Sequence, residues 1–146
     1  MPSDRPDGND PYDLRRFLDA QREQYTPARA ELSRGIKHGH WMWYIFPQLR
    51  GLGLSSTSLY YGISGKEEAL AYLRHPVLGS RLRECTRLVN AIEGKTIRRI
   101  FASPDDMKFR SCMTLFAEIT AEGTEFREAL EKYFGGKPDP ATLARL

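Results

Sequence analysis

The stretch "VLGSRLRECTRLVNAI", residues 77–92, decides the fold class of this chain. Its apolar side chains return every three or four positions, the spacing that places them on one face of an α-helix. The stretch therefore predicts an amphipathic helix packed against a core, and Gly94 is expected to end it. The residues on the apolar face are Leu78, Leu82, Cys85, Leu88, Val89 and Ile92.

The N-terminal part of the chain repeats this helical signature. Residues 10–11, Asp-Pro, supply an N-cap and a first-turn proline. Thr-Pro at residues 26–27 repeats the signal, so we expect either a kinked helix or a second short helix through Ser33, ended by Gly35. The shared apolar face consists of Leu14, Phe17, Leu18 and Tyr25.

Capping signals predict further helices toward the C-terminus. Residues 50–58, "RGLGLSSTS", are rich in turn-forming Gly and Ser and predict a loop. The expected helices are residues 64–74 with a capping box at Ser64 and Glu67, a helical turn at 96–101, residues 103–119, residues 124–134, and a short terminal helix that begins at 139–140.

No alternation typical of strands and no hairpin signal occurs along the chain. We therefore predict an all-α fold: a compact single domain of six to eight short helices over residues 11–146, with no substantial sheet and with residues 1–10 as a flexible leader. A chain of 146 residues is long enough for one domain with its own core.

The composition, 40% apolar and 28% charged, is typical of a globular protein. The longest apolar run, Trp41 to Phe46, is far shorter than the ~20 residues that span a bilayer, and the first residues contain no apolar signal segment. We therefore expect a cytoplasmic protein with no membrane partner. Cys85 and Cys112 lack metal-ligand spacing and are expected to be thiols that pack as small hydrophobes.

Two polar residues lie where packing favours apolar groups, and such a group is costly to bury unless a partner satisfies it. On a helical wheel Lys108 falls inside the apolar face, between Leu115 and Ile119. It either extends its stem to water or holds an anionic or carbonyl-bearing ligand. Gln21 lies within the apolar face of the first helix and is expected to bond to a backbone group.

The aromatic run "HGHWMWYIFPQ", residues 38–48, must be enclosed, because its apolar residues point in every direction whether it is helical or extended. Core packing accounts for most of it. His40 and Gln48 stand at its edges, however, beside indole and phenol rings. A few convergent polar groups with aromatic walls are typical of small-ligand sites.

These residues suggest a binding pocket for a small anionic or nucleotide-like ligand, with Trp41 or Trp43 as a stacking wall. His40 and Lys108 are the candidate catalytic residues, as acid or base and as stabiliser of negative charge. The reaction type and any cofactor stay unassigned. No metal is expected, because His38 and His40 lack further ligands nearby. The proposed ligand-binding residues are His40, Trp41, Trp43, Gln48, Lys108 and Ser111.

An alternative function uses the basic region of residues 74–110, which has nine Lys and Arg against four Asp and Glu. This region favours an anionic partner, so the chain is alternatively a non-enzymatic adaptor or a nucleic-acid-binding module. No recognition-helix, zinc-finger or RNA-recognition signature accompanies the charge, which favours the small ligand over nucleic acid. The sequence does not specify the oligomeric state.

Four segments together resemble the bacterial and fungal family called domain of unknown function 1810, over about residues 12–146. They are "HWMWYIFPQLRGLG", "EALAYLRHPVLGSRL", "DDMKFRSCMTLF" and "YFGGKPDPATL". The resemblance implies a compact, mainly α-helical domain and no established activity.

Some members carry the label calpastatin, which the core-forming pattern of this chain does not support. The chain departs from the family at Gly62 and at Cys112, where Ala and a second Ser are usual, and the latter argues against a hydroxyl role there. The family's recurring polar positions correspond to His40, Gln48, His75, Arg81, Lys108 and Ser111.

Overall fold

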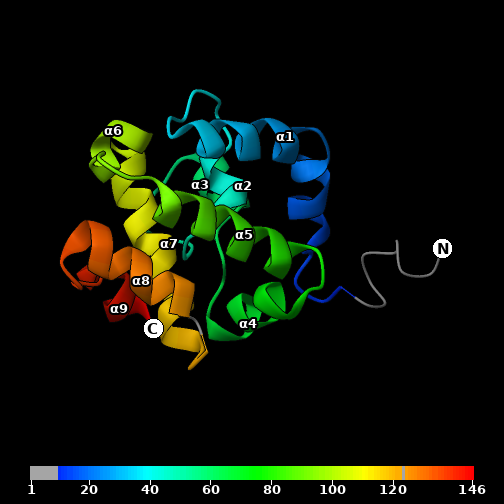
Figure 1. Ribbon diagram of the computed structural model, residues 1–146. Coiled ribbons are helices and arrows are strands. Elements are labelled where there is room, and N and C mark those ends of the chain that lie inside the picture. The colour runs from blue at the N-terminus through cyan, green and yellow to red at the C-terminus, as the bar shows by residue number, and fades with distance from the viewer. Residues whose placement is uncertain (1–9, 123) are drawn as a thin grey trace.

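The computed structural model describes residues 10–122 and 124–146. Within these ranges the chain forms nine α-helices, and its only β-structure is an isolated bridge between Leu49 and Ile63 (Figure 1). The all-α prediction is therefore confirmed. The helices are α1 (Arg15–Arg34), α2 (Met42–Ile45), α3 (Ser56–Tyr60), α4 (Lys66–Arg74), α5 (Leu78–Ala91), α6 (Ile97–Phe101), α7 (Asp105–Ile119), α8 (Thr124–Phe134) and α9 (Pro140–Arg145).

The structure has more helices than predicted, because two single turns of helix escaped the sequence pattern. One, α2, lies inside the aromatic run. The other, α3, occupies part of the predicted loop, where the Ser55 side chain accepts a hydrogen bond from the backbone N–H of Ser58. Such short turns carry too few apolar repeats to produce a recognisable period. Residues 1–9 of the predicted leader lie outside the described residues.

A single helix, α1, runs through Pro27 without a break, so the N-terminal segment forms one helix of 20 residues. The carboxylate of Asp10 accepts hydrogen bonds from the backbone N–H groups of Leu14 and Arg15 at 2.7 and 2.9 Å. It thus satisfies donors at the helix start, but the predicted N-cap at Asp10 with a first-turn proline at Pro11 is wrong, because the helix begins four residues later and Leu14 occupies the N-cap position. Gly35 ends the helix in the left-handed conformation (φ 81°) that favours glycine.

The predicted helix at 64–74 exists as α4, but its cap differs from the predicted capping box. Gly65 occupies the N-cap position and offers no side chain. The carboxylate of Glu68, instead of Glu67, accepts a hydrogen bond from the Ser64 backbone N–H at 2.8 Å. The helix begins one residue later than predicted, so the acid that reaches back to Ser64 also moves by one position.

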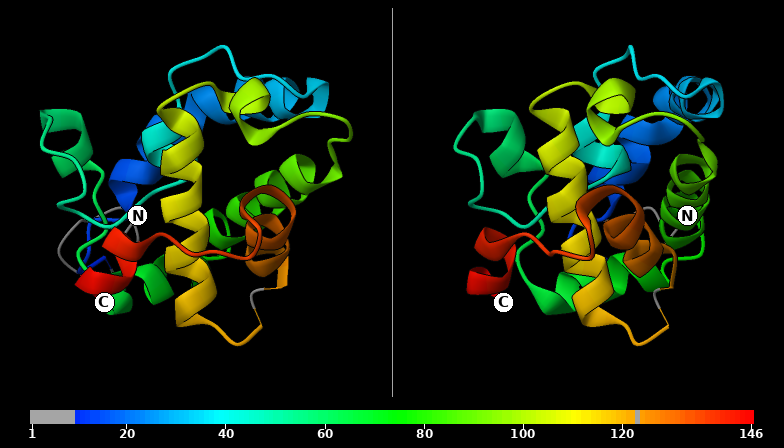
Figure 2. Two further views of the ribbon diagram at one scale, coloured as in Figure 1. Left: turned by 90° about the vertical axis from the view of Figure 1, so that its left-hand side faces the viewer. Right: turned by 60° about the vertical axis from the view of Figure 1, so that its left-hand side comes forward.

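A central helix, α7, runs through the middle of the fold, with α8 on one side of it and α3 and α9 on the other (Figure 2). The buried apolar residues form one continuous core around it. Burying each large side chain stabilises the fold by about 1.5–3 kcal/mol. The largest fully buried side chains are Trp41, Tyr72, Phe17, Phe46, Phe109, Phe116 and Phe126.

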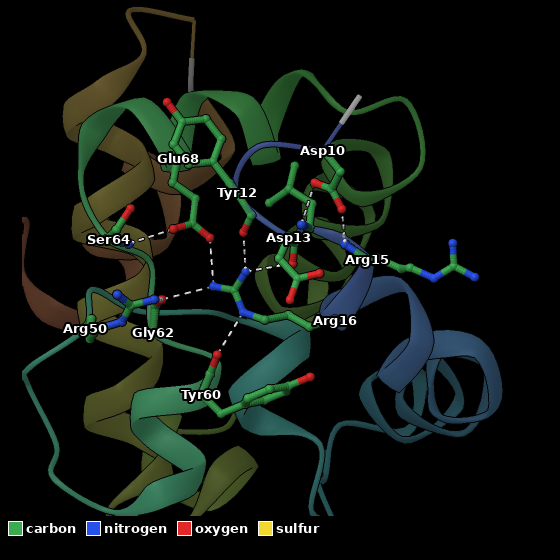
Figure 3. Close-up of polar contacts among 11 residues, drawn as sticks. Asp10, Tyr12, Asp13, Arg15, Arg16, Arg50, Tyr60, Gly62, Ser64 and Glu68 are labelled. Carbon is green, nitrogen blue, oxygen red and sulfur yellow. Dashed lines mark hydrogen bonds and ion pairs between the residues drawn. The ribbon is translucent and has the colours of Figure 1, made fainter. Parts of the chain in front are cut away.

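The base of the segment that carries α3, residues 50–61, is held by Arg16 of α1 (Figure 3). Its guanidinium donates to the Glu68 carboxylate at 2.7 Å, and further hydrogen bonds satisfy the rest of the fork. Backbone pairing of residues 48–50 with Ile63 closes the same base. The other acceptors of Arg16 are the carbonyl oxygens of Tyr12, Asp13, Tyr60 and Gly62.

Among the residues that the model describes, no helix has both the length and the apolar character that a membrane crossing requires. Cys85 and Cys112 are free thiols and both are buried, as predicted. Burial raises the pKa of Cys85 to about 12 and raises that of Cys112 well above its ordinary value.

Candidate functional site

A pocket of about 240 Å³ lies between three segments that are distant in sequence. These are residues 43–53, the first half of α7, and the start of α9, which lies beside α7 (Figure 2). We call it the Lys108 pocket. Its lining residues are Trp43, Gln48, Leu52, Gly53, Pro104, Met107, Lys108, Ser111, Asp139 and Ala141.

The ammonium group of Lys108 lies over the face of Trp43, with Nζ 4.0 Å from the ring centroid. Nζ also lies 3.1 Å from the carboxylate of Asp105, whose other oxygen pairs with the buried Lys37 at 2.8 Å. Burial alone would raise the pKa of Asp105, but the hydrogen bonds from Lys37 and Lys108 hold it below its ordinary value. Lys108 is therefore fixed against an aromatic wall, as a cation–π pair.

The side chain of Gln48 is buried, with 8% exposed, and its Nε2 atom has no hydrogen-bond partner among the described residues. Its backbone is fixed, because the Gln48 carbonyl accepts from the N–H of Ile63 at 2.8 Å. Gln48 lines both the Lys108 pocket and a second cavity of about 10 Å³, and the two cavities also share Trp43, Leu52 and Gly53. Space of that size holds about one water molecule. An amide donor on a residue that lines two cavities thus has no protein acceptor.

Farther along α7, the hydroxyl of Ser111 donates to Asp139 Oδ2 at 2.8 Å. The same oxygen accepts from the hydroxyl and the backbone N–H of Thr142, so Asp139 caps α9 as predicted. The Asp139 backbone N–H donates to Thr114 Oγ1 at 2.8 Å, which attaches the cap to α7. The sequence identified Asp139 only as a helix cap and missed it as a pocket residue.

Four of the six predicted ligand-binding residues, Trp43, Gln48, Lys108 and Ser111, line this pocket, whereas His40 and Trp41 do not. His40 is exposed and is absent from the lining, so this pocket does not bring the predicted pair of catalytic residues together.

Trp41 is fully buried in the core, and its indole N–H donates to Glu31 Oε1 at 2.9 Å. The same oxygen accepts from the backbone N–H groups of His38 and Gly39. Glu31 therefore holds this turn against α1, with Trp41 inside the core and His40 exposed to solvent. Trp43 alone forms the aromatic wall.

The predicted environment of Gln21 is confirmed, because its Nε2 donates to the Tyr44 carbonyl at 2.7 Å. Much of the basic region has intramolecular partners. Arg83 and Arg87 both pair with Glu125 at 2.8 Å, and Arg81 lies over the ring of Tyr25. These arginines hold helices together, which reduces the charge available to an external anion.

A larger groove of about 540 Å³ lies between α5 and α8. It has no aromatic wall, and most of its lining side chains are exposed and charged. Asn90 there has a buried Oδ1 without a partner, but its Nδ2 donates to the Glu125 carbonyl at 3.0 Å. We place the candidate site in the Lys108 pocket because its polar groups converge beside an indole ring. Within the described ranges, no group of three or more His, Cys, Asp or Glu residues is arranged to hold a metal ion.

These features define a mainly α-helical protein with a polar-aromatic pocket between its helices. Residues 11–146 match the family described as "Protein of unknown function (DUF1810)", and the chain belongs to this family. Its fold is similar to the crystal structure of the conserved hypothetical protein Rv1873 from Mycobacterium tuberculosis, with a TM-score of 0.93 and 53% sequence identity. The alignment covers 94% of this chain and 98% of that one. No curated protein matches the chain.

Proposed function

We propose that the chain binds a small organic ligand in the Lys108 pocket through a carboxylate or similar acidic group. The observation that carries the proposal is the buried Nε2 of Gln48, a donor without an acceptor, on a residue that lines the same pocket as Lys108. A buried polar group without a partner costs about 1–3 kcal/mol, and a ligand acceptor would remove that cost. Lys108 has three N–H donors, of which Asp105 takes one.

The size and donors of the pocket favour a small acid over a nucleotide. Its volume of about 240 Å³ is below the ~300–1,000 Å³ of sites for drug-sized ligands. Phosphate sites commonly use free backbone N–H groups at a helix N-terminus. At the start of α7, the N–H groups of Asp106, Met107 and Lys108 already donate to the carbonyls of Ala102 and Pro104.

Thermal-shift screening of the full chain with small carboxylic acids and nucleotides tests this proposal. A ligand present at 100 times its Kd stabilises by ~2.7 kcal/mol, which raises the Tm of a domain of this size on the order of 5–10 °C. We expect carboxylic acids to produce such shifts in Tm. Lys108→Met should weaken the affinity for these acids at least tenfold and so reduce the shifts. The Met side chain keeps a stem to pack on Trp43, and Asp105 keeps Lys37 as its partner.

The matched control is Lys66→Met, which removes an exposed lysine at the start of α4, outside the pocket lining. It should leave the affinity for the same acids unchanged. Equal loss of affinity in both variants would indicate a general charge effect and contradict the proposed site. So would the absence of any ligand-induced shift.

A further inference from the structure

The Lys108 pocket carries a negative charge as well as a positive one. Asp139 and Lys108 both line it, and Ser111, which binds Asp139, lies three residues after Lys108 on α7. Three residues of helix rise by about 4.5 Å, so Lys108 and Ser111, the partner of Asp139, start from backbone positions roughly one helical turn apart on α7. Asp105, which pairs with Lys108, and Lys37, which pairs with Asp105, lie outside the pocket lining, and the formal charges of these four residues cancel.

Asp139 has capacity for another hydrogen bond. Its Oδ2 atom accepts the three bonds from Ser111 and Thr142, whereas Oδ1 accepts none within the described part of the chain. An ionised carboxylate has about four lone-pair sites over its two oxygens. A ligand that placed a cationic N–H donor there would form a charge-assisted hydrogen bond, which is roughly twice as strong as a neutral one.

We infer that the ligand is a zwitterion of the amino-acid type, with its carboxylate toward Lys108 and Gln48 and its ammonium group toward Asp139. This inference rests on the proposed function. A plain carboxylate would meet Lys108 favourably but would be repelled by Asp139, and a plain amine would be repelled by Lys108. Only a ligand with both charges pairs with both side chains. Its carbon skeleton would contact the apolar lining, which consists of Trp43, Leu52, Pro104, Met107 and Ala141.

Matched sets of compounds test the inference by isothermal titration calorimetry on the full chain. The protein amino acids are screened first by thermal shift. Each one that binds is then compared with the acid that lacks its amine and the amine that lacks its carboxylate; for leucine these are 4-methylpentanoate and 3-methylbutylamine. We expect the zwitterion to bind at least about tenfold more tightly than either analogue, because each analogue loses one charge-assisted bond.

Asp139→Asn separates the charge from the structural role of this residue, because Asn is as good an N-cap as Asp. In this variant the amino acid should bind no more tightly than its acid analogue. The acid analogue should bind the variant at least as tightly as it binds the parent chain. Glu118→Gln, which removes an exposed acid on α7, is the control, and in this variant the amino acid should still bind more tightly than its acid analogue.

The outcomes distinguish this inference from the proposed function. If no amino acid binds, if the acid analogue binds as tightly as the zwitterion, or if Asp139→Asn preserves the advantage, the zwitterion inference is overturned. The proposed function still stands in these cases provided that acids bind and Lys108→Met weakens them. If neither acids nor amino acids bind, both are overturned.

Discussion

Arg16 and Glu68, 52 residues apart in sequence, form an ion pair at 2.7 Å with side chains only 5% and 2% exposed. All the donor nitrogens of the Arg16 guanidinium take part in hydrogen bonds, so the pair connects α1, the start of α4 and the base of the 50–61 segment (Figure 3). Removing one partner of a buried pair leaves the other charge without compensation, which costs about 3–5 kcal/mol.

We therefore predict that Arg16→Met lowers the free energy of unfolding by about that amount, measured by urea denaturation. The control is Arg22→Met on the same helix, which removes an exposed pair with Asp19 at 3.0 Å. Exposed pairs contribute about 0–1 kcal/mol, so this variant should unfold almost like the parent chain. A similar small change in both variants would show that the Arg16 network does not stabilise the fold.

His75 caps α5 through its side chain, since Nδ1 accepts hydrogen bonds from the backbone N–H groups of Val77 and Leu78 at 3.1 and 3.2 Å. Burial lowers the pKa of His75 below 6.5, although Asp10 acts in the opposite direction. As the pH falls, the unfolded chain therefore takes up a proton at His75 before the folded chain does. The contribution of the neutral His75 side chain to the free energy of unfolding is fully present above about pH 6.5 and is lost as the pH falls through the lower folded pKa.

We expect the free energy of unfolding of the parent chain to decrease between pH 7 and pH 5, as measured by urea titrations across this range. His75→Asn provides an acceptor for the same N–H groups and does not titrate, so its decrease should be smaller. His38→Asn, at an exposed histidine, should behave like the parent. Identical pH profiles for parent and His75→Asn would contradict the capping role.

Glu31 satisfies three donors with one carboxylate oxygen, including the indole N–H of the buried Trp41. Burial alone would raise its pKa, but the hydrogen bonds from Gly39, His38 and Trp41 hold it below 4.5. We predict that Glu31→Ala destabilises the chain by about 1–3 kcal/mol, because a buried donor loses its acceptor. Glu31→Gln keeps an acceptor and should cost less. Glu23→Ala, at an exposed acid of α1, serves as the reference in the same urea experiment.

Both cysteines should be inert in the folded protein. Their thiols are buried and their pKa values are raised, so the reactive thiolate is scarce and inaccessible. A chromogenic disulfide reagent at pH 8 is expected to label neither of the two cysteines in buffer and both in urea. Rapid labelling in buffer would mean that the core opens readily at Cys85 or Cys112.

Local chemistry made most of the fold predictable. The apolar period of residues 77–92 and the cap at Asp139 identify α5 and α9 without knowledge of any distant contact. The errors concern local structure that depends on a residue distant in sequence. At the start of α4, Glu68 bonds to the Ser64 N–H and also pairs with Arg16 of α1, and no rule based on neighbouring residues includes the Arg16 bond.

The candidate site was only partly predictable for the same reason. Lys108 and Gln48 stand out in the sequence because polar groups next to apolar ones require partners. His40 was assigned to the site because it adjoins Trp41, yet Glu31 on α1 turns Trp41 into the core. Asp139 was missed because its capping role is local, whereas its place in the pocket depends on Ser111, 28 residues earlier.

The unpartnered amide of Gln48 leads to a prediction that requires no ligand. If Nε2 is buried without an acceptor in the free protein, its desolvation lowers the stability of that state. Gln48→Met replaces the amide with an apolar side chain of similar length, so we expect the free protein to be as stable or more stable, by up to about 1–3 kcal/mol. The same change should weaken acid binding, because the donor is gone. Gln24→Met on the exposed face of α1 is the control and should alter neither property.

A variant at Gln48 that gains stability while it loses ligand binding would show that the amide serves the ligand and not the fold. A clear loss of stability in Gln48→Met would instead assign the amide a structural partner, such as a water in the 10 Å³ cavity, and remove the main support for the site.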